Sequence, residues 1–325
     1  RNETFKYVKT PWYIWIDHDD LLEGGQFIKE DIEQLQQRPE FHGIWCPYWY
    51  AVDDYGNCTT LHSRERIIRL DHKFRWQGRV HEVLLPDGPG VWYRDNRIVW
   101  KHLRGYADKT ERNLRLLFLD FYERPDDPRV WLYIAHQYFA GGEWLKALDW
   151  YERFAMDQRG VLPERWQACC YMSRAYRRLG DCNAALKWAF MALSMAPMWA
   201  DGHLQLAESY RQLGEWTSAV YWAENARRQE VPPEPAFINP IEHKIEASHV
   251  LAVCSSMLGD YDRAVQETER CLLDMPTDKG LLKNLKLFQD AKSRKELRDS
   301  FALVAPSFGD KKLIALSRRL NGLQK

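Results

Sequence analysis

Two patterns of hydrophobic and polar positions follow one another along this 325-residue chain. Up to about residue 100, short aromatic and β-branched runs alternate with polar turns, whereas from about residue 108 the apolar residues recur at helical spacing. This change predicts a mixed α/β region followed by an all-α region. The chain length is typical of two domains.

The first region predicts several strands and one helix. Residues 12–16 form a continuous apolar run, which is typical of a strand buried on both faces of a mainly parallel sheet. Residues 27–37 carry apolar side chains on one helical face, and residues 44–52 predict a second strand that ends in a turn. Further strands are expected to include residues 66–70 and residues 97–102.

The second region is internally repetitive. Glycines recur 38, 34 and 45 residues apart, and an alanine follows each of them at the same offset. The 34-residue interval is the period of the tetratricopeptide repeat, where glycine permits the turn between paired helices and alanine their close approach. The pattern predicts such repeats over residues 125–292, interrupted by prolines at 232–235, and a helical tail at 293–325. The glycines are Gly142, Gly180, Gly214 and Gly259.

Charge and cysteine content exclude several classes of function. Lys+Arg and Asp+Glu both number 46, so no global charge favours nucleic acid or an anionic membrane, and the tail at 311–325 is the one basic candidate segment. Seven cysteines without a C-x-x-C pair argue against a disulfide framework and a thiolate zinc site. No apolar run approaches the roughly 18 residues of a membrane span. We therefore expect a cytoplasmic protein with free, buried thiols.

An acidic cluster follows the first predicted strand. Asp17, Asp19 and Asp20 come directly after residues 12–16. Carboxylates at the carboxyl end of a parallel strand lie where open α/β sheets bind ligands, and hard oxygen ligands suit Mg²⁺ or Mn²⁺. The alternative is that these residues cap the N-terminus of a helix.

Four segments, in order, resemble elements of the family 2 glycosyltransferases, particularly those that carry tetratricopeptide repeats behind the catalytic domain. The resemblance covers most of residues 1–124. It implies an α/β fold, namely the C-terminal portion of a GT-A nucleotide-diphospho-sugar transferase domain, followed by the all-α repeat array. The segments are residues 1–2 (end of A-R-N), 15–20 (D-x-D), 76–84 (G-x-V-H-E-x-L) and 100–114 (H-x-G-Y, then K-x-x-R-N-L), with Arg104 an extra residue.

The resemblance implies a donor and metal site. Asp17, Asp19 and Asp20 would bind the nucleotide-diphospho-sugar, such as a UDP-sugar. The metal, Mn²⁺ or Mg²⁺, would be bound by Asp19, Asp17 and His102, since imidazole is an acceptable ligand for Mn²⁺. The alternative for His102 is a hydrogen-bonded core histidine.

The resemblance also implies an acceptor site. Glu82 would be the catalytic base that removes the acceptor proton during an inverting transfer. Trp76, Arg79 and His81 would contact the acceptor, a glycan or a protein docked on the helical repeats. The alternatives are that His81 and Glu82 form a surface pair and that Trp76 is a packing residue.

Two other functions remain open at this stage. The family's domain opens with a strand–helix–strand unit that holds the base and ribose, so we expect that unit to precede Arg1, or the chain to be a decayed remnant. In the second case the protein would be a non-catalytic interaction scaffold, because repeat arrays bind partners on concave surfaces. A metal-dependent hydrolase would need further ligands that the sequence does not show. Tryptophans of the repeats would stack on sugars or pack between helices.

Overall fold

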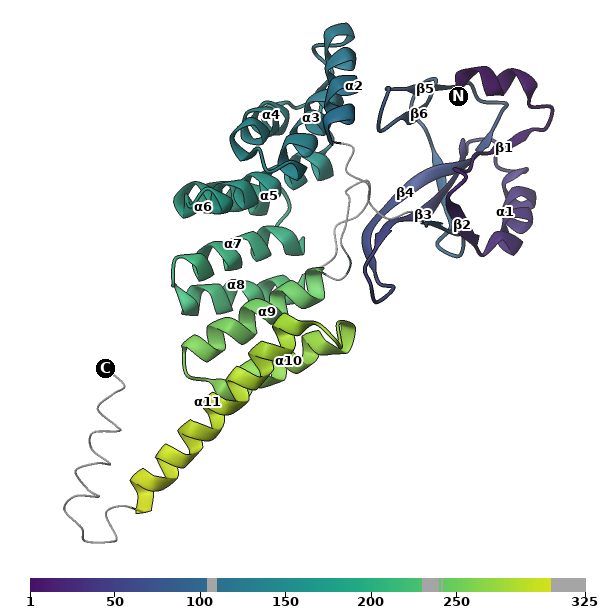
Figure 1. Ribbon diagram of the computed structural model, residues 1–325. Helices are drawn as coiled ribbons and strands as arrows, with labels where there is room; N and C mark the ends of the chain where they lie inside the picture. Colours follow the sequence, from purple (N-terminus) through teal and green to yellow (C-terminus); the bar gives the residue numbers. More distant parts are fainter. Residues whose placement is uncertain (104–109, 230–239, 241, 305–325) are drawn as a thin grey trace.

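The computed structural model describes residues 1–103, 110–229, 240 and 242–304, with side chains for all of these except 242–244 and 301–304. The proline-rich insertion at 232–235, the basic segment at 311–325 and residues 104–109 of the H-x-G-Y segment lie outside the described residues. Two regions are evident in Figure 1: a sheet with one flanking helix, and a stack of helices beside it. We call residues 1–103 the N-terminal region and the stack the helical array.

The N-terminal region is built on a mixed sheet. Its strand order is β1-β4-β3-β8-β2, with β7 also pairing with β3. The β1–β4, β3–β4 and β2–β8 pairs are antiparallel, whereas β3 pairs with β7 and β8 in parallel. The strands are β1 (Trp12–Ile14), β2 (Asp20–Glu23), β3 (Gly43–Val52), β4 (Cys58–Arg69), β7 (Trp92–Arg94) and β8 (Val99–His102), and a separate hairpin consists of β5 (Phe74–Gln77) and β6 (Val83–Pro86).

The expectation of a doubly buried strand at residues 12–16 is wrong. Strand β1 ends at Ile14 and stands last in the sheet order, paired with β4 alone among the described strands. Ile14 and Ile16 are 42% and 57% exposed. An apolar run is buried on both faces only where other elements cover both, and β1 at the end of the sheet does not have that cover. The sheet is also mixed rather than mainly parallel.

One face of the sheet packs against helix α1 (Ile28–Leu35), close to the helix expected at residues 27–37. The apolar face of this helix is where the sequence placed it. Leu35 is fully buried and joins strand residues from β3, β4 and β8 in one core. The buried members of that core are Leu35, Ile44, Cys46, Tyr48, Ile67, Ile98 and Trp100.

The β3–β4 ladder changes register at three points, and two of these β-bulges lie beside the acidic cluster. Ile44 pairs with Ile67 and Trp45 with Glu65, which leaves Arg66 as an extra residue on β4. Further along, Trp49 pairs with Leu61 and Ala51 with Thr60, so Tyr50 is extra on β3. Bulges redirect a side chain relative to the regular alternation of a strand, and these two redirect Arg66 and Tyr50.

The helical array has the paired-helix architecture predicted for tetratricopeptide-type repeats. Each predicted glycine lies in the turn between paired helices with φ between 76° and 82°, and each following alanine (Ala147, Ala185, Ala219, Ala264) is fully buried. Successive helices pack on one another, with α2 on α3 and α11 on α10 at the ends. The helices are α2 (Thr110–Glu123), α3 (Pro128–Ala140), α4 (Trp144–Met156), α5 (Leu162–Arg178), α6 (Cys182–Met195), α7 (Ala200–Gln212), α8 (Trp216–Arg228), α9 (Glu242–Met257), α10 (Tyr261–Asp274) and α11 (Lys279–Val304).

Helix α11 continues across residue 293, where the sequence placed the start of a separate tail. The tryptophans of the array pack between helices: Trp188 is 4% exposed, and Trp144, Trp150 and Trp199 lie against the same core. All seven cysteines are free and buried. Within the described residues, no helix combines the length and the apolar character that crossing a membrane requires.

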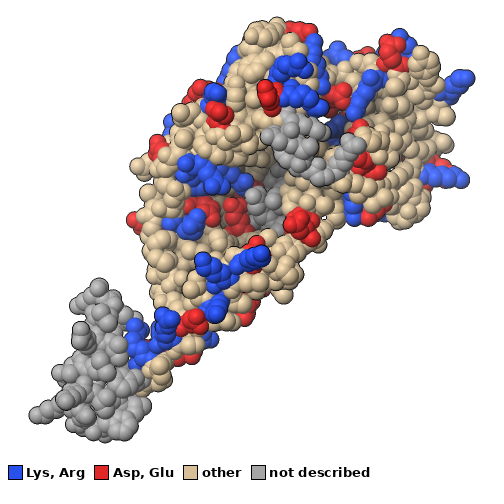
Figure 2. All heavy atoms as spheres, viewed as in Figure 1, with Lys and Arg blue, Asp and Glu red and all other residues tan. Residues whose placement is uncertain are grey.

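The N-terminal region contacts the array near both of its ends. Arg79 pairs with Asp120 of α2 at one end. At the other, the turn between β3 and β4 reaches the α10–α11 connection, where Asn57 Nδ2 donates to the Asp274 carbonyl at 3.0 Å and Tyr55 Oη lies 3.2 Å from Thr277 Oγ1. Figure 2 shows a hollow in the surface between the two regions, bordered by acidic and basic side chains.

Candidate functional site

The β2–β8 ladder brings two acids and a histidine together. Asp20, the first residue of β2, lies opposite His102, the last residue of β8. Asp19 precedes the strand, and its carbonyl accepts a hydrogen bond from Leu103 N at 2.8 Å. One ligand atom from each of Asp19, Asp20 and His102 lies within 4.8 Å of the others. Below, the term metal centre stands for these three side chains as a candidate site for a metal ion.

The geometry of the metal centre fits a divalent cation. His102 Nδ1 lies 3.5 Å from Asp20 Oδ1 and 3.8 Å from Asp19 Oδ1. Neighbouring ligands of an octahedral ion with bonds of about 2.1 Å are about 3 Å apart, so small movements would close the site around an ion. His102 Nδ1 is buried and makes no hydrogen bond within the described part of the chain. A mixed imidazole and carboxylate set suits Mn²⁺ better than Mg²⁺.

Asp20 is held rigidly within this cluster. Its Oδ1 accepts a hydrogen bond from Tyr48 Oη at 3.0 Å, and its Oδ2 accepts one from Asp17 N at 3.1 Å. Arg66 Nη1 lies 2.9 Å from the same Oδ2, and both of these side chains are fully buried. Burial and the nearby Asp20 raise the pKa of Tyr48, so its hydroxyl stays a donor. Only Oδ1 of Asp20 points toward His102.

The guanidinium of Arg66 lies next to Asp20 and is surrounded by aromatic rings. Its guanidinium carbon is 3.8 Å from the centre of the Trp15 ring, 4.4 Å from that of Tyr48 and 5.2 Å from that of Trp100. Burial lowers the pKa of Arg66, opposed by the charge of Asp20. Arg66 remains protonated even so, because the ordinary pKa of a guanidinium lies far above neutral pH.

The carboxylate of Asp17 does not lie with the other two acids and His102, as its expected role as a metal ligand would require. Its carboxylate faces Arg1 at 3.0 Å and Arg66 at 3.7 Å, and it is not among the three clustered ligands. The reason is a turn between residues 17 and 20, closed by Asp20 N donating to the Asp17 carbonyl at 3.0 Å. This turn directs Asp17 away from His102, and Asp20 takes the position expected for Asp17.

Glu82 is connected to the acidic cluster through one side chain. Arg1 Nε lies 3.0 Å from Glu82 Oε2, while Arg1 Nη2 donates to Asp17 Oδ1 at 3.0 Å. The Glu82 side chain is 32% exposed, so its carboxylate is open to an incoming group. Arg1 therefore bridges Glu82 and Asp17.

Trp76 forms part of the packing beneath this arrangement. It is 8% exposed and meets Trp15 edge to face at 4.9 Å. The side chain of Asn2 pairs with both the N–H and the carbonyl of Trp76, and Arg1 lies 4.8 Å from the ring centre. Trp76 therefore fits the alternative of a packing residue better than that of an acceptor contact, because its ring is buried and packs against Arg1.

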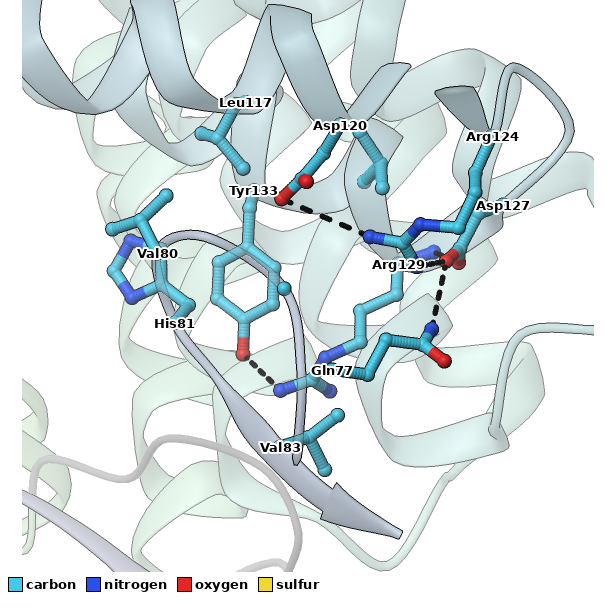
Figure 3. A pocket seen from close by; sticks show the side chains of 12 residues that line it. Gln77, Val80, His81, Val83, Leu117, Asp120, Arg124, Asp127, Arg129 and Tyr133 are labelled. Carbon is cyan, nitrogen blue, oxygen red and sulfur yellow. Dashed lines mark hydrogen bonds and ion pairs between the residues drawn. The ribbon is translucent and has the colours of Figure 1, made fainter. Parts of the chain in front are cut away.

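Arg79 and His81 face the helical array, which corrects the expectation that they contact an acceptor. Arg79 pairs with Asp120 and Glu123 of α2, each at 2.5 Å. His81 stacks on Tyr133 of α3 with 4.4 Å between ring centres and 10° between planes, and Figure 3 shows the two rings side by side. The positive φ of 52° at His81 reverses the backbone there, so His81 and its neighbour Glu82 point to different surroundings.

The space behind these two residues is too small for a substrate. A cavity of about 20 Å³ lies between the segment before β6 and helices α2 and α3, lined among others by Val80, Leu117 and Tyr133 (Figure 3). Such a volume holds about one water molecule. Burial, followed by the charges of Arg129 and Arg64, lowers the pKa of His81 to about 4, so the interface contains a neutral imidazole.

Sequence reasoning missed three residues of the site: Tyr48, Tyr50 and Arg66. Tyr50 lies parallel to the His102 ring, with 5.7 Å between centres and 4° between planes. Arg66 had a weak signal, since a charged residue beside Ile67 and Ile68 in a predicted strand needs a buried partner. The bulges that place Tyr50 and Arg66 have no signature in a single sequence.

No family model matches the sequence, and no curated protein matches it. Among solved structures, MamA is similar with a TM-score of 0.41 and 18% identity, over 53% of this chain and 97% of MamA. A tetratricopeptide-repeat protein of Thermus thermophilus has a TM-score of 0.42 and 21% identity, over 56% of this chain and 90% of that protein. The APC/C hetero-tetramer Cut9-Hcn1 has a TM-score of 0.47 and 15% sequence identity, over 65% of this chain and 39% of that chain.

Proposed function

We propose that the N-terminal region is the metal-binding and acceptor-binding part of a GT-A-type glycosyltransferase. It would transfer a sugar from a nucleotide-diphospho-sugar, in our proposal a UDP-sugar, to an acceptor. The observation that carries the proposal is the convergence of Asp19, Asp20 and His102 within 4.8 Å at one end of the β2–β8 ladder. In this proposal residues 1–124 form the transferase part, 125–292 the repeats and 293–325 a tail.

The side chains around the metal centre support specific roles. A bound Mn²⁺ would neutralise the diphosphate of the donor. Asp19 and His102 would bind the ion, and Asp20, fixed by Tyr48 and Arg66, would contribute its Oδ1. This assignment places the ion where β2 begins and β8 ends, close to the acids of the D-x-D segment.

Glu82 would be the general base of an inverting transfer. Its carboxylate would accept the proton of the acceptor nucleophile as that atom bonds to the anomeric carbon and the nucleotide diphosphate leaves. Arg1, whose Nε lies 3.0 Å from Glu82 Oε2, would hold this carboxylate in place for the acceptor. The acceptor would approach from the hollow between the N-terminal region and the array.

The second candidate function is an interaction scaffold without catalysis. The observation that favours it is the helical array, whose helix pairs α3/α4, α5/α6, α7/α8 and α9/α10 stack as in proteins that bind partners on concave surfaces. A scaffold has no need of a metal centre. Metal binding therefore separates the two functions.

Calorimetric titration of Mn²⁺, and then of UDP and UDP-sugars with Mn²⁺ or with EDTA, tests the proposal. We expect metal-dependent binding in the native chain, a loss of more than about tenfold in affinity in Asp19→Ala and His102→Ala, and retained binding in Glu82→Gln. Asp54→Ala, which removes an exposed carboxylate in the turn between β3 and β4, is the matched control and should bind like the native chain. Equal nucleotide affinity with Mn²⁺ and with EDTA would contradict the transferase and leave the scaffold.

A further inference from the structure

We infer that Arg66 supplies a permanent positive charge beside the metal centre. This charge makes the binding of a divalent metal ion there depend on an anionic co-ligand of the diphosphate class. The inference rests on the proposed function, because it concerns the same metal centre. It assigns to Arg66, a residue outside every motif of the sequence, control over which ligands the centre accepts.

The position of Arg66 is fixed by the fold. The bulge at residue 66 places the side chain under the acids, and the guanidinium is enclosed by the rings of Trp15, Tyr48 and Trp100. The residue is fully buried, and its Nη1 lies 2.9 Å from Asp20 Oδ2. A side chain enclosed in this way has no room to swing out when another cation enters, so its charge stays beside the centre.

The local charge then limits the affinity for a free metal ion. Asp17, Asp19 and Asp20 contribute three negative charges and Arg66 one positive charge, while Arg1 is shared between Asp17 and Glu82. Counted over these side chains, a divalent cation would leave the cluster close to neutral, with a fixed guanidinium nearby. Charges that are out of water are little screened by salt, so this repulsion persists at physiological ionic strength.

Arg66 also restricts how Asp20 can bind an ion. Its Nη1 occupies the space at Oδ2, where Asp17 N also donates, which leaves Oδ1 as the carboxylate oxygen directed at His102. The protein then offers an ion one oxygen each from Asp19 and Asp20 and one imidazole nitrogen. A six-coordinate ion needs further ligands. A diphosphate supplies both the missing oxygens and the negative charge that offsets Arg66.

The first arm of the test uses the native chain. Mn²⁺ is titrated calorimetrically alone and in the presence of inorganic pyrophosphate, with the affinity of Mn²⁺ for free pyrophosphate subtracted. We expect binding to be about tenfold tighter or more with pyrophosphate. Binding of equal affinity in both conditions would overturn the inference while leaving the proposed metal centre intact. No binding in either condition would contradict the metal centre itself, and with it the inference.

The second arm changes the charge of Arg66. Arg66→Gln removes the charge but keeps a polar side chain, so Mn²⁺ alone should bind about tenfold tighter than in the native chain, and pyrophosphate should tighten Mn²⁺ binding less than it does there. Mn²⁺ should also raise the melting temperature of this variant more than that of the native chain. Arg66→Lys keeps the charge and should keep the dependence on pyrophosphate. Unchanged Mn²⁺ affinity in a folded Arg66→Gln chain would overturn the inference. If the variant does not fold, the titration of the native chain with and without pyrophosphate still tests the inference.

Discussion

The three acids of the D-x-D segment have different surroundings although they lie within four residues. Asp17 faces Arg1, Asp20 is fully buried between Tyr48 and Arg66, and Asp19 lies at the side of the cluster with its side chain 14% exposed. The difference arises because β2 begins at Asp20, which fixes that residue in the ladder opposite His102. At the residue scale, burial and partners separate the roles of side chains that look equivalent in the sequence.

Arg79 provides a residue-scale prediction. Its guanidinium pairs with Asp120, whose side chain is 5% exposed, and with Glu123, which is 60% exposed. Arg79→Ala should lower the free energy of unfolding by about 1–3 kcal/mol, because Asp120, a largely buried charge, keeps only Arg124 at 3.7 Å as a charged partner. It should leave Mn²⁺ affinity unchanged, because Arg79 faces α2 rather than the metal centre. Urea denaturation and calorimetry measure the two effects.

The double variant of Arg79→Ala with Asp120→Ala completes a thermodynamic cycle. A coupling energy of about 1 kcal/mol or more between the two residues is expected for this pair. Unchanged stability in Arg79→Ala, with no coupling to Asp120, would contradict the role of this pair at the interface.

At the scale of elements, local sequence signals located the repeats well and the sheet less well. Each predicted interhelical glycine has the positive φ that its turn requires, and each predicted alanine is buried, because both properties depend on neighbours close in the chain. Residues 12–16 were predicted as a strand buried on both faces, whereas strand β1 stands at the end of the sheet with Ile14 exposed. An apolar run specifies a strand but not the neighbours that it pairs with.

Gly180 tests the turns of the array. It has φ of 82°, and an added Cβ would meet nothing within 4 Å, so Gly180→Ala isolates the cost of the left-handed backbone. We expect a loss of about 1 kcal/mol in the free energy of unfolding. Gly141→Ala is the matched control, because Gly141 has φ of −79° and its Cβ would lie 3.4 Å from the nearest atom. Equal losses in the two variants would contradict the assignment of strain to the turn.

At the scale of the whole molecule, one histidine, His81, lies where the N-terminal region meets the array, and a second, His136, lies within the array next to that contact. His81 stacks on Tyr133, and His136 of α3 lies 2.6 Å from Tyr151 Oη. Burial lowers the pKa of His81 to about 4 and that of His136 to about 3, the latter helped by the charge of His81. Both imidazoles are therefore neutral in the folded chain at neutral pH.

The pH dependence of stability follows from these lowered pKa values. Below the unfolded pKa near 6.5, the unfolded chain takes up protons that the folded chain excludes, so stability is full above about pH 6.5 and falls toward pH 4. Each histidine contributes up to about 1.4 kcal/mol per pH unit in that window. Urea denaturation at pH 7.5, 6.5 and 5.5 measures the slope. His81→Phe, which keeps a ring against Tyr133, should reduce it, and a variant of the 74% exposed His18 should not.

The sequence by itself determined the division into a β-containing region and a helical repeat array, the helix at residues 27–37 and the segments that contain the site. These features depend on side-chain periodicity and on the backbone freedom of glycine, which act between residues close in the chain. The tertiary structure decided that Asp20 rather than Asp17 joins Asp19 and His102, that Arg79 and His81 serve the interface, and that Arg66 lies under the acids. Those outcomes depend on strand register, bulges and the docking of two regions, in which residues far apart in the chain compete for the same partners.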